Sequence, residues 1–97
     1  MTEEIDNDFY DRADAYIDLA NKQITTSSDA TEVSASFSYS ASRFNTWLVA
    51  ASFENSKDMA AEKQEILEHF TKEYSAMLEE NLSDYIENFN EYMGIEK

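Results

Sequence analysis

The chain has 97 residues, with 21 Asp and Glu against seven Lys and Arg, and it contains no cysteine or proline and a single glycine. The net charge of −14 argues against direct binding to nucleic acid or to anionic membrane surfaces, because both attract cationic side chains. Without cysteine there is no disulfide or thiolate chemistry, so apolar packing must stabilise the fold. The length predicts one domain, residues 1–97, with 1–5 and 95–97 frayed.

The first periodic segment predicts a helix from about residue 6 to residue 26. Its aspartates fall away from an apolar stripe, and Asp6 or Asn7 can cap its start. A polar break follows, in which Asp29 and Glu32 have the spacing of a capping box. The apolar stripe consists of Phe9, Ala13, Tyr16, Ile17, Ala20 and Ile24.

The segment from Val33 to Ala41 carries two conflicting patterns. Alternation of apolar residues with serine favours a strand, whereas the stripe that starts at Val33 and Phe37 and continues to Ala51 favours a helix. We predict a helix, because no other part of the chain could pair with a lone strand. A strand paired across a homodimer is the alternative.

The turn at residues 55–58 leads into a third helix, whose apolar periodicity continues to Met93. The apolar face shifts by roughly 100° near residues 78–83, so one long helix changes its packing partner there, or it kinks or splits. A straight helix would extend past a three-helix core and need a cover, for which a second copy is the simplest choice. The two apolar groups are Met59, Ile66, Phe70, Tyr74 and Met77, and then Leu82, Tyr85, Ile86, Phe89 and Met93.

These patterns predict an all-α protein, a small three- to four-helix bundle with a long or kinked C-terminal helix. The expected core is Phe9, Tyr16, Ile17, Phe37, Phe44, Leu48, Ile66, Phe70 and Met77.

Three stretches together resemble a known bacterial family. They are residues 9–17 (FYDRADAYI), 41–47 (ASRFNTW) and 77–94, which includes MLEENL and ends in YMG. The chain resembles the domain-of-unknown-function family numbered 3144, short acidic proteins of proteobacteria. The resemblance covers about residues 9–94 and implies a bacterial, single-domain protein without an assigned activity. It carries over no catalytic or binding residue.

The candidates for a metal site are His69, Glu65 and Glu73, which share one side of the third helix. The Glu-x-x-His spacing of di-iron bundles is missing, because position 66 is isoleucine. A solvated acidic face therefore explains the three residues better, and we predict no metal and no cofactor. The aspartates at positions 6, 8 and 11 also fail the calcium-loop pattern, because the glycine required at its sixth position is an aspartate here.

No motif for catalysis emerges: the chain has neither a nucleophile elbow nor a glycine-rich phosphate loop. Arg43, in mid-helix, is expected to tie helices together through carboxylates, and Trp47 to flank the core.

We therefore predict a non-enzymatic interaction protein that self-associates, with Leu82, Tyr85, Ile86, Phe89 and Met93 at the interface. Its partner is itself or another protein with a basic or apolar surface. Two alternatives are an acidic decoy or regulator of a basic nucleic-acid-binding protein and a metal-dependent enzyme centred on His69. Because the first residues, MTEEIDND, do not form a secretory signal, a cytoplasmic location is expected.

Overall fold

The computed structural model describes residues 6–95, which contain helices and no strand, so the all-α prediction is confirmed. The helices form two compact units, divided between Ser52 and Phe53, and the prediction of a single domain stays a prediction. Of the ends expected to fray, 1–5 and 96–97 lie outside the described residues. The elements are α1 (Phe9–Gln23), α2 (Ala30–Ala51), α3 (Ser56–Ala61), α4 (Lys63–Glu87) and α5 (Phe89–Tyr92).

The segment Val33–Ala41 is helical and belongs to α2, as predicted. Its start is fixed by the capping box, in which the Asp29 carboxylate accepts from the Glu32 N–H at 2.9 Å and the Glu32 carboxylate accepts from the Asp29 N–H at 3.0 Å. Two amide donors that the helix leaves free are thereby satisfied. The alternation with serine therefore does not specify a strand, because the same residues also carry the helical stripe and follow directly after a strong N-cap.

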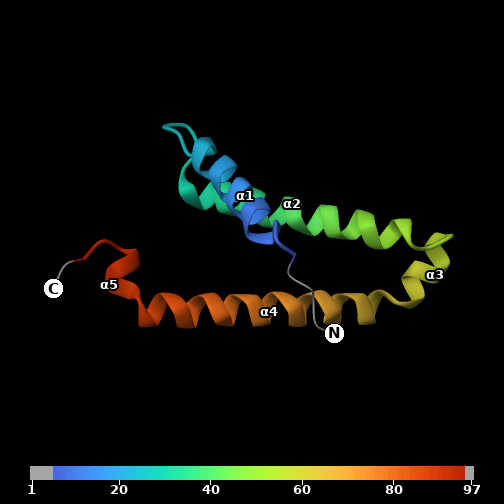
Figure 1. Cartoon of the computed structure of the whole chain (residues 1–97). Coiled ribbons are helices and arrows are strands. Elements are labelled where there is room, and N and C mark those ends of the chain that lie inside the picture. The colour runs from blue at the N-terminus through green and yellow to red at the C-terminus, as the bar shows by residue number, and fades with distance from the viewer. Residues whose placement is uncertain (1–5, 96–97) are drawn as a thin grey trace. The chain divides into compact units, whose positions relative to one another are not determined.

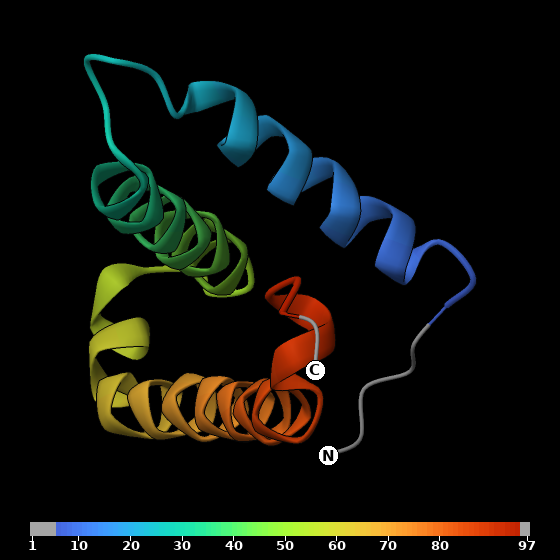
Figure 2. The same ribbon diagram turned by 90° about the vertical axis from the view of Figure 1, so that its left-hand side faces the viewer.

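The first unit is a helical hairpin in which α1 and α2 leave their connecting loop and diverge (Figure 2). Tyr16 and Phe37 meet between the helices, with ring centroids 6.5 Å apart. Val33 is 7% exposed, and it is the one buried side chain among residues 6–95. A pair of diverging helices buries only the strip where they touch, so the rest of both apolar stripes stays uncovered.

In the second unit, α4 runs without interruption through residues 78–83, where the sequence allowed a kink or a split (Figure 1). The helix ends at Asn88, whose side-chain amide donates to the Asp84 carbonyl at 3.2 Å and to the Asp84 carboxylate at 2.9 Å. This side chain competes for a carbonyl of the last turn, which favours termination there. The apolar face thus shifts along one continuous helix.

The single turn of α5 is closed by the one glycine of the chain. Gly94 has a φ of +70°, and the N–H of Ile95 donates to the Asn90 carbonyl at 2.8 Å while that of Gly94 donates to the Glu91 carbonyl at 3.4 Å. These two bonds form a Schellman motif, whose left-handed residue is usually glycine.

The predicted core is wrong for most of its members. Phe9, Ile66 and Phe70 are half-buried, whereas the other six are exposed. The physical reason is that periodicity identifies the apolar face of a helix but does not say what covers that face. The exposed members are Tyr16, Ile17, Phe37, Phe44, Leu48 and Met77.

Candidate interaction surfaces

Exposed apolar side chains are the main feature of both units. Among residues 6–95, 21 large apolar side chains are between 38% and 75% exposed. Single exposed apolar residues are normal, but contiguous patches mark interaction sites. All five side chains predicted for an interface are exposed: Leu82, Tyr85, Ile86, Phe89 and Met93, which we call the C-terminal stripe.

The C-terminal stripe is held in shape by contacts between the end of α4 and α5. The rings of Tyr85 and Tyr92 lie 4.5 Å apart between centroids, and the Tyr92 hydroxyl donates to the Asp84 carboxylate at 2.9 Å. Asn88 donates to the other oxygen of the same carboxylate. Asp84 thus organises the turn from α4 into α5.

The contact with Asp84 raises the pKa of Tyr92 above its usual value near 10, mainly through the hydrogen bond and secondarily through the negative charge of the carboxylate. The protonated phenol donates this hydrogen bond, so the folded turn favours the neutral form. The contact is therefore present below the ordinary tyrosine pKa and is lost as the pH rises through the raised value.

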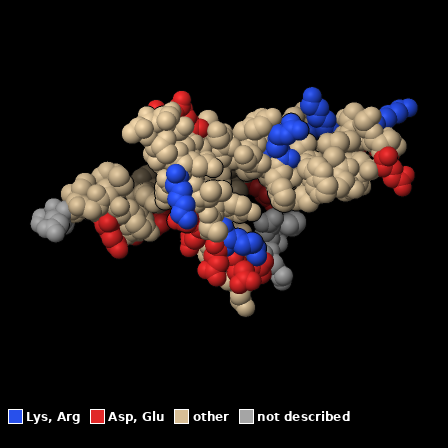
Figure 3. All heavy atoms as spheres, turned by 90° about the horizontal axis from the view of Figure 1, so that it is seen from above, with Lys and Arg blue, Asp and Glu red and all other residues tan. Residues whose placement is uncertain are grey.

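Charge is distributed very unevenly between the two long helices. The 22 residues of α2 include two charged side chains, Glu32 and Arg43, and no carboxylate occurs between Glu32 and Glu54. The 25 residues of α4 include seven carboxylates and two lysines. In Figure 3, uncharged residues (tan) cover most of the visible face, and Asp and Glu (red) gather in separate groups. Charge therefore distinguishes two helices that both carry exposed large apolar residues, five on α2 and seven on α4.

A groove of about 520 Å³ lies between α1 and α2. Tyr16 and Leu19 of α1 and Phe37 and Phe44 of α2 provide its large apolar walls, and Ser40 is among its small residues. Sequence reasoning missed this groove, because it placed Tyr16, Phe37 and Phe44 in a closed core. The long interval without a carboxylate was the available signal that α2 differs from the other helices.

The proposed metal ligands are only partly brought together. His69 Nε2 lies 3.5 Å from a carboxylate oxygen of Glu73, and neither residue forms a hydrogen bond or ion pair with Glu65. Within residues 6–95 no group of three or more His, Asp or Glu side chains is placed to hold a metal ion. His69 also packs its ring edge-on against Phe70, with centroids 5.0 Å apart. A pair of ligands on one helix, of which His69 is exposed and Glu73 half-buried, falls short of the four that a structural zinc site uses.

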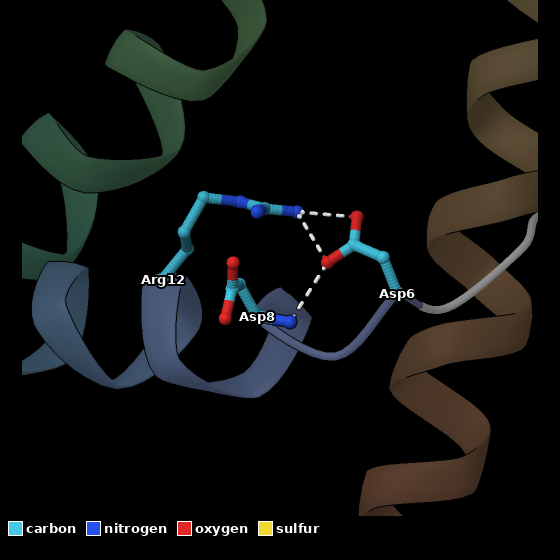
Figure 4. Close-up of polar contacts among 3 residues, drawn as sticks. All are labelled: Asp6, Asp8 and Arg12. Carbon is cyan, nitrogen blue, oxygen red and sulfur yellow. Dashed lines mark hydrogen bonds and ion pairs between the residues drawn. The ribbon is translucent and has the colours of Figure 1, made fainter.

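The aspartates at the start of α1 are engaged locally (Figure 4). One oxygen of the Asp6 carboxylate accepts from the Asp8 N–H at 2.9 Å, and the other accepts from the Arg12 guanidinium at 3.1 Å. The Arg12 hydrogen bond, followed by that from Asp8, lowers the pKa of Asp6. Asp8, rather than the predicted Asp6 or Asn7, is the N-cap residue, and Asp6 instead orders the turn before it.

Two further sequence expectations are corrected. Arg43 donates to the hydroxyl of Tyr39, one turn earlier on the same helix, at 3.3 Å, and no carboxylate of the described chain pairs with it. It therefore does not tie helices together through a carboxylate, and α2 itself has no acid after Glu32. Trp47, expected beside the core, is 66% exposed.

Comparison with known proteins gives a family without an assigned function. Residues 9–86 match the family described as "Protein of unknown function (DUF3144)", which confirms the resemblance seen in the sequence. The NMR structure of the protein NB7890A from Shewanella sp is 42% identical, covers 95% of this chain and 97% of its own, and has a TM-score of 0.75. No curated protein matches the chain significantly. Between residues 6 and 95, no helix has the length and hydropathy needed to cross a bilayer.

Proposed function

We propose that this chain, which belongs to the DUF3144 family, is a non-enzymatic protein-interaction module that self-associates, located in the cytoplasm. The observation that supports this proposal is the contrast between one buried side chain, Val33, and 21 exposed large apolar ones. Fully burying a large apolar side chain contributes about 1.5–3 kcal/mol, and a native domain needs many such contributions to offset its loss of conformational entropy. Each of the two units, taken by itself, buries too few of them between its own helices.

Self-association supplies the missing burial. Folded proteins that depend on a second copy often have no stable monomer, so assembly and folding become one equilibrium. The chain has no disulfide as a substitute, because it has no cysteine. The exposed apolar residues then belong to the interior of an assembly.

We assign the C-terminal stripe to this interface because of the direction in which it faces and because it is exposed. Because α4 is continuous, its two apolar groups point in directions roughly 100° apart, and one packing partner covers only one of them. Ile86, at 75%, is the most exposed of the large apolar side chains described. A second partner must therefore cover the stripe.

A second candidate function is binding of a basic protein by the anionic helix α4. The seven carboxylates of α4 favour it, since they create a field that attracts cationic partners. A pull-down at low and moderate salt tests this function, and the absence of a captured basic protein at low salt would argue against it.

The mass in solution, measured by light scattering on a sizing column at low and moderate salt, tests self-association. We expect at least twice the 11.2 kDa of one chain at both salt concentrations, because apolar contacts are not screened. A wild-type monomer at all concentrations would overturn the proposal.

Ile86→Asp and Phe89→Asp test the role of the C-terminal stripe, with Thr71→Asp on an exposed polar part of α4 as the matched control. We expect the first two variants to lose the assembly and the control to keep it. If both stripe variants retain the wild-type mass, the stripe lies outside the interface, although self-association itself would stand.

A further inference from the structure

The carboxylate-free stretch of α2 raises a question about how copies of so acidic a protein approach one another. Two chains of charge −14 repel, and carboxylates brought together at an interface add a cost of desolvation. Residues 33–53 contain no Asp or Glu, and their one charge, Arg43, is opposite in sign to that of the whole chain. This stretch is the part of the chain where a second copy meets the least repulsion.

The exposed side of α2 also has the composition of an interface. At about 100° per residue, Ser36, Ser40, Arg43 and Trp47 fall within about 60° of one another on the helix surface. Tyr39 and Phe44 flank them, each 63% exposed. We call these six residues the α2 face. Tryptophan, tyrosine and arginine are the residue types enriched at binding hot spots.

Arg43 does not oppose such a contact. Its guanidinium bonds to the Tyr39 hydroxyl at the edge of the α2 face, so the charge is displaced from the middle of the face. Small residues, Ser36 and Ser40, occupy the rest of the middle and allow close approach of a second helix. Both serines also line the groove of about 520 Å³ between α1 and α2. Its volume is within the range of about 300–1,000 Å³ that holds drug-sized ligands, so it admits a bulky aromatic side chain.

The available area is sufficient for a specific contact. If an aromatic side chain carries about 200 Å² of surface, the exposed parts of Tyr39, Phe44 and Trp47 amount to roughly 770 Å² over two copies. A specific interface needs about 1,000 Å² in total, and the neighbouring serine, alanine and leucine surfaces supply the remainder.

We infer that the α2 face is the surface through which two copies of this chain pair, α2 against α2 about a twofold axis. The inference rests on the proposed self-association and adds a second contact between the copies to the one at the C-terminal stripe. In a twofold contact the same patch serves both copies, so a patch without carboxylates meets another patch without carboxylates. The C-terminal stripe, set among Glu79, Glu80, Asp84 and Glu87, lacks this property.

A matched pair of serines tests the inference. Ser40 lies at the middle of α2 and Ser75 on an exposed part of α4, and each is changed to glutamate. We expect Ser40→Glu to raise the dissociation constant of the assembly at least tenfold in sedimentation equilibrium, and Ser75→Glu to leave it within twofold. A dimer of unchanged affinity in Ser40→Glu would overturn the inference.

Loss of the dimer can also unfold the helices, and the effect of Ser40→Glu would then have two causes. A second measurement therefore keeps the dimer intact and detects the contact by crosslinking. The chain has no cysteine, so Ser40→Cys and Ser75→Cys each carry one thiol for a short bis-maleimide linker. We expect covalent dimers from Ser40→Cys and few from Ser75→Cys, and the reverse order would contradict the inference. A wild-type monomer would overturn the proposed function, whereas a wild-type dimer that does not crosslink at position 40 would overturn the α2 pairing alone.

Discussion

The two long helices, α2 and α4, present similar apolar side chains in opposite electrostatic surroundings. Tyr39 on α2 and Tyr74 on α4 are 63% and 58% exposed, yet α2 has two charged residues and α4 has nine besides its histidine. Exposure alone therefore does not distinguish a surface for self-association from a solvated face. The charge around each exposed ring does distinguish them, because a second copy is itself negatively charged and nearby carboxylates repel it.

The largest expected difference between the helices comes from truncating these two tyrosines. Tyr39→Ala removes a ring from the α2 face together with the hydroxyl that holds Arg43, so we expect the dissociation constant of the dimer to rise about tenfold or more. Tyr74→Ala removes a ring of similar exposure from the acidic helix, and we expect a change within twofold. Sedimentation equilibrium measures the dissociation constants of both variants. Equal increases in the two would show that charge does not distinguish the interface from the solvated face.

A smaller difference is expected at the helix starts. α2 begins with a capping box, whereas the N-cap residue of α4, Glu62, makes no side-chain capping bond within the described chain. Asp29→Ala should lower the free energy of unfolding by about 1 kcal/mol, since it exposes an unpaired N–H. Glu62→Ala should change it by less than about 0.5 kcal/mol. Urea denaturation at one fixed protein concentration compares the two, and a larger loss in Glu62→Ala would contradict the assignment of the caps.

The smallest effect concerns α5. Because the pKa of Tyr92 is raised by Asp84, the contact that holds α5 contributes below about pH 10 and is lost as the pH rises further. We expect the NMR shifts of residues 89–95 to change in this alkaline range. Tyr92→Phe lacks the hydroxyl and should show no such step beyond that of the other tyrosines. The same step in both proteins would show that Asp84 does not hold the turn through Tyr92.

The local features of the fold were predictable because they depend on neighbouring residues. The capping box at Asp29, the turn at Asn55, which caps α3 by accepting from the Asp58 N–H at 2.9 Å, and the stop at Gly94 all follow from short sequence patterns. The helical state of residues 33–41 required one further argument, the lack of a pairing partner for a strand.

The features that could not be predicted depend on what lies beside a helix. The periodic stripe through Phe37, Phe44 and Leu48 correctly marks the apolar side of α2, but the hairpin leaves that stripe largely uncovered. Similarly, the shift of the apolar face near residues 78–83 was visible, whereas the break five residues later depends on the bonds between Asn88 and Asp84. A map of carboxylates along the sequence would have singled out α2 without any structure.

The central claim, that the uncovered apolar side chains are covered by a second copy, is tested most directly by thermal unfolding at several protein concentrations. Circular dichroism at 222 nm follows the helices over a hundredfold range of concentration. If assembly and folding are one equilibrium, the unfolding midpoint rises steadily with concentration. A midpoint that stays constant across the whole range would show that one copy folds alone and would contradict the account.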